Sequence, residues 1–111
     1  MGFDRELVKG TTATVVLRLL REREMYGYEM VKEVNARTGG LFKWKEGTLY
    51  PCLHRLEVDG LLRSHWREAP NGKKRKYYRI TAKGLAELAR RTEEWKQFAG
   101  GVNVLLLGKT G

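Results

Sequence analysis

The sequence predicts a mainly α-helical fold with one small β-hairpin, followed by a long C-terminal helix. Three segments before residue 60 carry apolar residues at the three- and four-residue spacing of helices. Between residues 62 and 80 the spacing changes to the two-residue alternation of strands, interrupted by turn residues. After residue 81 a longer apolar series has a heptad-like spacing. We therefore expect one domain over residues 1–80 and a helix with a short tail over residues 81–111.

The composition indicates a single folded domain with a concentrated positive charge. The chain has 111 residues, of which 41% are hydrophobic, and a formal net charge of +9. Residues 63–83 contain eight basic residues and one acid, so they hold most of that charge. Such a patch attracts a polyanion, either nucleic acid or an anionic membrane, although a charged run can also be a solvated face. The lone cysteine, Cys52, and the lack of a signal-peptide pattern or membrane-length apolar run favour a reducing cytoplasm and no membrane partner.

The first helix is expected over about residues 11–23. Its apolar stripe follows the i, i+3, i+4, i+7 spacing and consists of Ala13, Val16, Leu17 and Leu20. Thr11 or Thr12 would cap its start, because a hydroxyl can accept a hydrogen bond from a free helix amide. Gly10 leaves two alternatives for the residues before Lys9, which either extend this helix or form a separate arm.

Two shorter helices follow a break at residues 25–27. The second is expected over about residues 28–37, ending before two glycines, and the third over about residues 48–59, ending before Gly60. Their apolar faces consist of Tyr28, Val31 and Val34 in the second helix and Leu49, Leu53 and Leu56 in the third. Pro51 is placed in the first turn of the third helix, where backbone N–H groups have no helical partners.

The segment after Gly60 predicts a β-hairpin with a basic tip. In its first strand Leu62, Ser64 and Trp66 alternate with Arg63, His65 and Arg67, which gives one apolar and one basic face. The turn residues are Ala69, Pro70, Asn71 and Gly72. The second strand is expected over residues 76–80. Because Tyr77 and Tyr78 are neighbours on it, one is expected in the core and the other exposed.

A long helix is expected from about Ala82, with Thr81 as its cap. Its heptad-like seam consists of Leu85, Leu88, Thr92, Trp95, Ala99, Val102 and Leu106. A single helix of this length has too few partners within so small a chain, so the seam predicts contact with a second copy and a homodimer. Thr92 weakens the seam, and Gly100–Gly101 would bend or end the helix.

The order of three helices, a hairpin and a long helix is that of a winged helix-turn-helix domain (residues 1–80) with a C-terminal dimerisation helix and tail (residues 81–111). In such folds the third helix enters the DNA major groove. The hairpin, called the wing, lies against the neighbouring backbone or minor groove. The basic patch is on this hairpin, so charge and topology both point to double-stranded DNA.

The sequence also resembles the PadR-like family of transcriptional regulators from about Lys9 to Leu106. The matching motifs are Tyr26-Gly27-Tyr28-Glu29, Gly47-Thr48-Leu49-Tyr50-Pro51, Arg55-Leu56-Glu57, Gly60-Leu61, Ser64 and Trp66, Arg75-Lys76-Tyr77-Tyr78-Arg79-Ile80-Thr81, and Gly84. No single motif is decisive, but their order and spacing together are specific. The resemblance implies a homodimeric, repressor-type, cytoplasmic protein that reads an inverted-repeat operator. It also implies, more weakly, release of DNA by a small hydrophobic or aromatic effector.

The candidate DNA-binding residues lie at the third helix and on the hairpin: Lys45, Thr48, Tyr50, Pro51, His54, Arg55, Lys73, Lys74, Arg75 and Lys76. Hydroxyls and amides at a helix start can meet phosphates, and arginine can pair with guanine. The hairpin cations would supply affinity and salt sensitivity more than specificity. Tyr50 is alternatively a core aromatic, and Arg55 alternatively pairs with Glu57 or a neighbouring acid.

Trp95 and Phe98 are candidates for effector binding between two copies of the long helix. The alternative interpretation, which we favour, is plain packing between those helices. Cys52 is expected to be an inert small hydrophobe rather than a redox switch, and Cys52, His54 and His65 do not have zinc-ligand spacing. We expect no cofactor or metal.

Two other functions compete with sequence-specific regulation. The same wing charge would serve an architectural DNA-binding protein without sequence specificity, and the long helix would serve a protein-interaction module that binds DNA weakly. An enzyme is not expected, because the sequence has no nucleophile–base set, phosphate loop, paired acids in a cleft or metal cluster.

Overall fold

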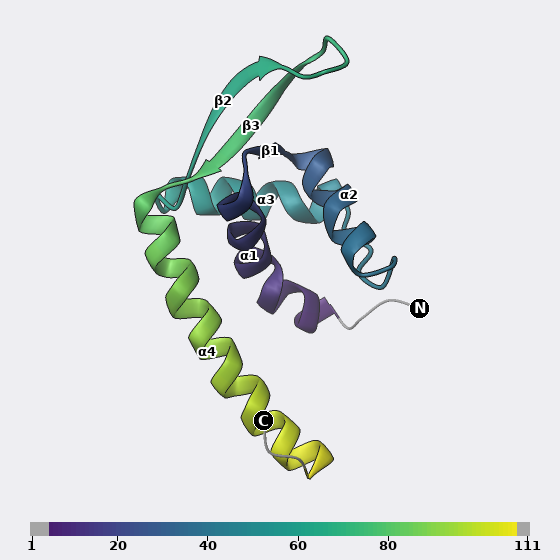
Figure 1. Ribbon diagram of the computed structural model, residues 1–111, viewed down its shortest axis with the longest axis vertical. Helices are drawn as coiled ribbons and strands as arrows, with labels where there is room; N and C mark the ends of the chain where they lie inside the picture. Colours follow the sequence, from purple (N-terminus) through teal and green to yellow (C-terminus); the bar gives the residue numbers. More distant parts are fainter. Residues whose placement is uncertain (1–4, 109–111) are drawn as a thin grey trace.

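The computed structural model describes residues 5–108, with side chains from residue 10 onward. The elements are α1 (Arg5–Glu22), β1 (Met25–Tyr26), α2 (Gly27–Arg37), α3 (Glu46–Val58), β2 (Leu62–Glu68), β3 (Lys74–Ile80) and α4 (Ala82–Leu107). The first three helices pack together, the β2–β3 hairpin projects from one side of them, and α4 leaves the base of the hairpin in the opposite direction (Figure 1). The predicted fold class, a winged helix-turn-helix with a long C-terminal helix, is confirmed.

The hydrophobic core lies where α1 meets α2, α3, the sheet and the start of α4. Val16 and Leu17 of α1 have no exposed surface, and Met30 of α2 and Leu53 of α3 are equally enclosed. Leu49 and Leu56 complete the buried edge of α3, as its spacing predicts. None of the helices within residues 5–108 is long and apolar enough to cross a membrane.

Helix α1 begins before the position predicted for it. It starts at Arg5 and passes through Gly10 without interruption, so the preceding residues extend the helix rather than form an arm. The prediction that Thr11 or Thr12 caps it is therefore wrong, since both lie inside the helix. A glycine in a helix is disfavoured by about 1 kcal/mol relative to alanine, which is too little to break a helix held by the core.

Helix α2 buries a different stripe from the one predicted. Gly27, Met30 and Val34 are buried, whereas Tyr28 is 52% exposed. The helix begins at Gly27, directly after β1. Tyr26 is its N-cap residue, and the backbone amide of Tyr26 donates to Glu29 Oε1 over 3.1 Å. Val34 is therefore buried as predicted, while Gly27 and Met30 take the buried positions expected for Tyr28 and Val31, and Val31 packs only partly against the core.

Helix α3 starts at Glu46, so Pro51 lies in its second turn rather than its first. Pro51 has no N–H group, and the Gly47 carbonyl oxygen loses its helical donor there. Gly47 and Pro51 are both exposed, which leaves that oxygen to water. Gly60 ends the segment at a φ of 78°, in the left-handed region, as expected.

The sheet has three antiparallel strands in the order β1-β3-β2. The sequence did not predict β1, whose two residues pair with Tyr77 and Tyr78 of β3. Tyr77 and Tyr78 are both buried, at 2% and 5% exposure, so the prediction that one is exposed is wrong. Tyr78 belongs to the core, while Tyr77 is covered on the other face of the hairpin by polar side chains.

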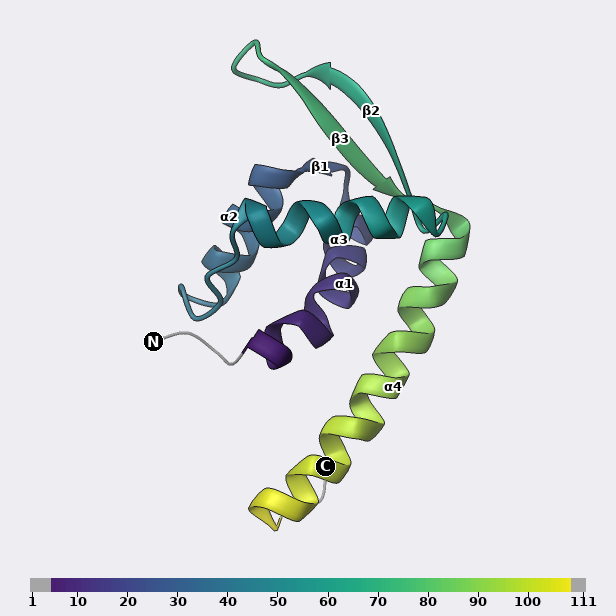
Figure 2. The same cartoon turned by 180° about the vertical axis from the view of Figure 1, so that it is seen from behind.

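The hairpin has the turn that its residues predict. Gly72 has a φ of 85°, and its amide donates to the Ala69 carbonyl over 2.9 Å. The predicted apolar face of β2 is covered only near its base: Leu62 is buried and Ser64 is half-buried, but Trp66 is 67% exposed. The helices end below that level, and the strands continue beyond them (Figure 2).

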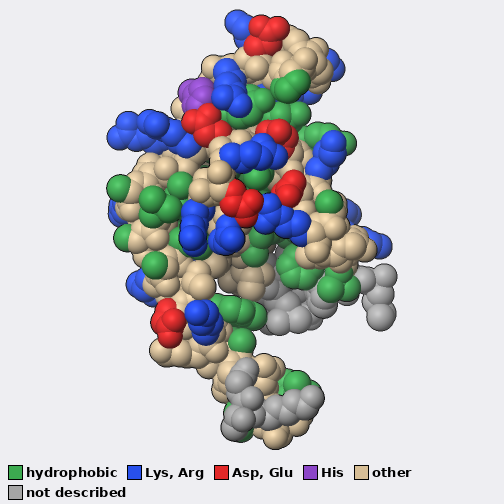
Figure 3. Space-filling model, in the orientation of Figure 1, with side chains coloured by type: hydrophobic (Ala, Val, Ile, Leu, Met, Phe, Trp, Pro, Cys, Tyr) green, Lys and Arg blue, Asp and Glu red, His purple; other side chains and the backbone are tan. Residues whose placement is uncertain are grey.

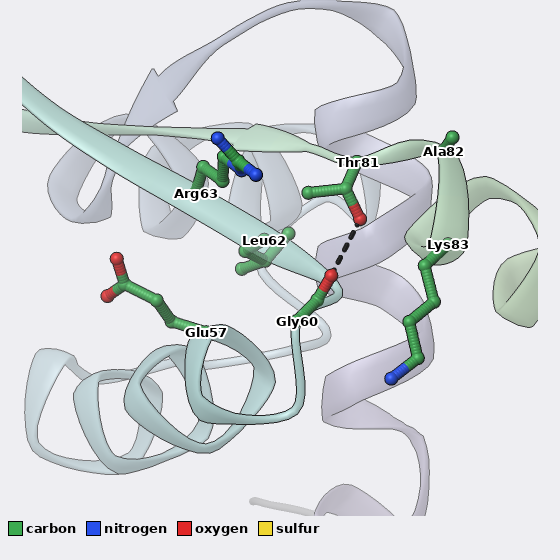
Figure 4. A pocket seen from close by; sticks show the side chains of 7 residues that line it. All are labelled: Glu57, Gly60, Leu62, Arg63, Thr81, Ala82 and Lys83. Carbon is green, nitrogen blue, oxygen red and sulfur yellow. Dashed lines mark hydrogen bonds between the residues drawn. The ribbon is translucent and has the colours of Figure 1, made fainter.

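Helix α4 leaves the domain at a joint shared with α3 and β2 (Figure 4). The Thr81 hydroxyl caps α4, since it accepts a hydrogen bond from the Gly84 amide over 3.0 Å, and it donates to the Gly60 carbonyl over 2.8 Å. Lys83 Nζ donates to the Asp59 carbonyl over 2.8 Å. These bonds tie the start of α4 to the end of α3 and fix its direction.

The predicted seam of α4 divides into two parts. Leu88 is 3% exposed and packs within the core, whereas Leu85 is 45% and Leu106 is 76% exposed. The helix does not end at Gly100–Gly101, one of the two expected outcomes, because it continues to Leu107 and ends at Gly108, with a φ of 65°. The first half of α4 therefore finds its partner in its own chain, and the second half projects free of it.

Candidate nucleic-acid interface

The polar side of α3 forms one side of the candidate interface. Helix α3 lies across the molecule with no other element in front of it, and the hairpin rises beside it (Figure 2). The six predicted residues here are all exposed: Lys45, Thr48, Tyr50, Pro51, His54 and Arg55. They lie at the N-cap and on the side opposite the buried leucines, so the structure brings them to one surface.

Tyr50 has both a packing contact and an exposed side. Its ring lies over Gly27, where a Cβ atom would come within 2.9 Å of Tyr50 Oη. The residue is nevertheless 45% exposed. Partial burial raises the pKa of Tyr50, and Glu46 and Tyr78 add to this effect while Arg75 opposes it. The hydroxyl therefore remains a neutral hydrogen-bonding group at neutral pH.

Arg55 has an acidic neighbour, but that neighbour is Asp59. Arg55 Nε lies 3.4 Å from Asp59 Oδ2, one turn away on α3, and the Arg55 side chain is 80% exposed. Glu57 instead faces the hairpin, where it accepts a hydrogen bond from Ser64 and lies 3.8 Å from Lys76 Nζ. An exposed ion pair of this kind contributes about 0–1 kcal/mol, so Arg55 can leave it for another anion at little cost.

The hairpin presents two of its four predicted cations, Lys74 and Lys76, toward the α3 side. Alternate residues of a strand share a face, so Lys74 and Lys76 lie on the face that carries Ser64 and that Glu57 contacts. Lys73 follows the turn at the tip and is exposed. Arg75 lies on the opposite face, with its guanidinium 5.6 Å from the ring centre of Tyr26. Its Nε atom is buried and has no hydrogen-bond partner among the described residues.

The opposite face of the hairpin carries a layer formed by His65 and Arg67 of the predicted basic face of β2, together with aromatic rings that the sequence did not predict there. Arg67 covers the ring of Tyr77 at 3.8 Å, and Tyr26 meets the same ring edge-on at 5.3 Å. Glu24 lies 3.4 Å from His65 Nε2 and 3.5 Å from Arg67 Nη1. The layer holds the hairpin against β1, and its sequence signals are the basic positions of β2 that include His65 and Arg67 and the alternation of Arg75, Tyr77 and Arg79 in β3.

The face formed by α1 and α2 carries balanced charge instead. Glu22 Oε1 lies 2.6 Å from Arg37 Nη2, Glu22 Oε2 lies 2.7 Å from Arg18 Nη1, and Arg37 Nε lies 2.8 Å from Glu33. Hydrogen bonding to Arg37 lowers the pKa of Glu22 from 4.5 to about 2. Basic and acidic side chains are interspersed over this side of the molecule (Figure 3). This side therefore has less net attraction for a polyanion than the hairpin does.

Trp95 and Phe98 lie on the projecting half of α4. Their ring centres are 6.1 Å apart, and the residues are 49% and 63% exposed. The shallow depression nearest to them, between α1 and α4, is lined by Leu85, Leu88 and their neighbours but by neither aromatic residue. The structure therefore shows the two rings as neighbours on the exposed surface of α4.

Cys52 lies on the flank of α3 and packs partly against the core. Burial raises the pKa of its thiol, and Arg91 of α4 opposes this effect. A thiol with a raised pKa holds little thiolate at neutral pH, which favours the interpretation of Cys52 as an inert side chain. Among residues 10–108, no group of three His, Cys, Asp or Glu side chains is arranged to hold a metal ion.

Comparison with known proteins gives a consistent result. Residues 16–90 match the model of the transcriptional regulator PadR-like family. A transcriptional regulator of Mycobacterium tuberculosis is 38% identical over 84 residues, which cover 76% of this chain and 75% of that protein.

Solved structures agree with this match in fold as well as in sequence. A transcriptional regulator from Clostridium thermocellum superposes with a TM-score of 0.85 at 34% identity, covering 94% of this chain and 98% of that one. A PadR-family transcriptional regulator from Eggerthella lenta has a TM-score of 0.77 at 42% identity, covering 91% and 86%. The family match runs from within α1 through α2, α3 and the wing to the start of α4, so this chain belongs to the PadR-like family of transcriptional regulators.

Proposed function

We propose that this protein is a sequence-specific DNA-binding regulator that acts as a homodimeric repressor on an inverted-repeat operator. The observation that supports it best is that the exposed polar side of α3 shares one surface with Lys74 and Lys76 of the wing. The 3.8 Å approach of Lys76 to Glu57 joins the two elements at that surface. The protein would act as a binding protein, without a catalytic step, in the cytoplasm where the DNA is.

The proposed interface divides into residues that read sequence and residues that hold the backbone. His54 and Arg55 point outward from α3 and would reach base edges in the major groove. Lys45, Thr48, Tyr50 and Pro51 lie near the start of α3, where hydroxyl, ammonium and backbone groups would meet phosphates or the groove wall. Lys73, Lys74 and Lys76 would contact phosphates whatever the sequence. Arg75 would act from the opposite face of the wing, where its guanidinium lies over the ring of Tyr26.

The dimer is proposed from the apolar end of α4. Leu105, Leu106 and Leu107 are 85%, 76% and 62% exposed, and such a cluster on a projecting helix needs a partner. A second copy of α4 would cover it and place two α3 helices about 34 Å apart, one turn of DNA. Trp95 and Phe98 would then lie near the second copy, where they either pack directly or enclose a flat aromatic effector. Quenching of Trp95 fluorescence by planar aromatic compounds would favour the effector.

The salt dependence of DNA affinity tests the wing. Replacing Lys73, Lys74 and Lys76 with alanine should weaken binding to all duplexes and lower the slope of log Kd against log salt by about 0.9 per lost phosphate contact. A control that replaces Arg18, Lys32 and Arg90 removes the same charge from α1, α2 and α4 and should leave the slope nearly unchanged. Equal slopes for the wild type and the wing variant would remove the wing from the interface.

Specificity tests the proposal against an architectural DNA-binding protein, which the same charge would serve. Selection of duplexes from a random pool should yield a palindromic sequence. The affinity for it should exceed that for random duplex by about 10³-fold or more at a stated salt concentration. Equal affinity for both would replace the proposed regulator with an architectural protein.

A further inference from the structure

Trp66 is a large aromatic side chain left bare on the wing. It is 67% exposed, although it lies on the strand face that the alternation of β2 marks as apolar. On that face Leu62 is buried and Ser64 donates a hydrogen bond to Glu57 of α3, so the face is covered up to position 64 and open beyond it. The hairpin extends past the helices (Figures 1 and 2), and the described residues leave two thirds of Trp66 exposed, at 67%.

The neighbouring side chains do not shield the indole. Lys76 is its partner across the strands, but Lys76 Nζ lies toward Glu57 and over the ring of Tyr78, at 5.6 Å from that ring's centre. Tyr77 occupies the adjacent register position on the opposite face and is only 2% exposed, because Arg67 and Tyr26 cover it. Tyr77 shows that side chains of this chain can cover an aromatic ring on the hairpin. No such cover is present for Trp66 among the described residues.

The surroundings of Trp66 indicate the chemistry of its partner. Lys74 and Lys76 lie on the same face, Lys73 follows at the tip, and Glu68 is the one acid among them. An apolar protein surface would have to desolvate these ammonium groups without compensation. A DNA backbone offers phosphates spaced between deoxyribose rings, so it matches both the cations and the apolar indole. The indole N–H is in addition a donor for a phosphate oxygen.

We propose that Trp66 packs against the deoxyribose–phosphate backbone at the edge of the groove that α3 enters. This inference rests on the proposed function, since it requires a duplex lying along α3 and the wing. Trp66 supplies contact area rather than charge, so its contribution is independent of base sequence and of counterion release. It differs in this from the lysines beside it, whose contribution decreases with salt.

The test is duplex binding by Trp66→Ala, measured with the selected duplex and with random duplex over a range of salt. We expect about tenfold weaker binding to both, within the range known for aromatic contacts to nucleic acid, with an unchanged salt slope. Trp66→Phe should retain most of the affinity. Leu41→Ala removes a comparably exposed apolar side chain, 58% exposed, from the loop between α2 and α3 and should have no effect. An unchanged unfolding midpoint would show that the variants fold.

Fluorescence gives a direct readout. In a Trp95→Phe variant the remaining tryptophans are Trp66 and the buried Trp44, which is 7% exposed, so acrylamide quenching reports chiefly on Trp66. Addition of duplex should protect this emission from quenching.

If the wild type binds DNA while Trp66→Ala binds equally well and no protection is seen, the inference about Trp66 is wrong and the proposed function is unaffected. A loss confined to the selected duplex would also contradict it, by indicating a base contact. Failure of the wild type to bind any duplex would instead refute the proposed function.

Discussion

At the scale of single residues, two glycines show how closely the elements approach one another. At Gly84, a Cβ atom would collide with the Leu61 carbonyl oxygen and the Ile80 side chain, so α4 can lie against the hairpin base only without a side chain there. At Gly27 the obstacle would be the ring of Tyr50, which is half-exposed and has room to move outward. Gly84 therefore allows the close approach of α4 to the hairpin base, while Gly27 leaves room for the ring of Tyr50, one of the residues proposed to contact DNA.

Glu22 gives a pH-dependent prediction. Its carboxylate lies between Arg18 and Arg37 and has a pKa lowered from 4.5 to about 2. Because the pKa is lower in the folded state, the stabilisation is fully present above pH 4.5 and decreases as the pH falls toward 2. We expect the Glu22→Gln variant to unfold at a lower temperature than the wild type at neutral pH and to approach it near pH 2. Thermal unfolding followed by circular dichroism over this range measures the difference; a constant difference at every pH would contradict the role of the charge.

At the scale of elements, the wing has two working faces rather than one apolar and one basic face. The face toward α3 carries lysines and the bare Trp66, and the opposite face carries the layer around Tyr77 that binds the hairpin to β1. One face of the wing thus holds the hairpin in place, and the other is free for the proposed contact with DNA. For this reason the side chain of Arg75 lies on the opposite face of the strand from its sequence neighbours Lys74 and Lys76.

Helix α4 also divides, and the division predicts two different effects of leucine removal. Leu88→Ala should lower the free energy of unfolding by about 2–5 kcal/mol, since Leu88 is 3% exposed and lies in the core. Leu105→Ala should leave the unfolding of the single chain unchanged, because Leu105 is 85% exposed. Denaturant unfolding of both variants, at protein concentrations low enough to dissociate a dimer, measures the difference. Similar losses in the free energy of unfolding for the two variants would contradict the division of α4 into a core half and a projecting half.

At the scale of the whole molecule, the shape is extended for the chain length. The radius of gyration is 15.3 Å, whereas a compact domain of this length has about 13 Å. The excess comes from α4, which continues past the core to the exposed residues 104–107 (Figure 1). A helix left without intramolecular partners over this length is what the proposed homodimer would explain.

Truncation after Arg91 tests the dimer at this scale. The shortened chain keeps Leu88 and its contacts in the core, so the domain should still fold, but it loses Trp95 and all residues beyond it. We expect a monomer in sedimentation experiments, with weaker binding to a palindromic duplex because two half-sites are no longer bound together. Circular dichroism serves as the control for folding. A truncated protein that remains a dimer would place the interface elsewhere.

The sequence by itself determined the helices, the hairpin turn, the cap of α4 and the polar side of α3, because each follows from spacing or from the chemistry of a few adjacent residues. Only the tertiary structure decided that Met25–Tyr26 forms a strand, that Tyr77 and Tyr78 are both buried, that Trp66 is bare and that Arg75 leaves the lysines. Alternation in a strand records which residues share a face. Whether that face is covered depends on where neighbouring elements begin and end, and this is set by contacts between residues far apart in the chain.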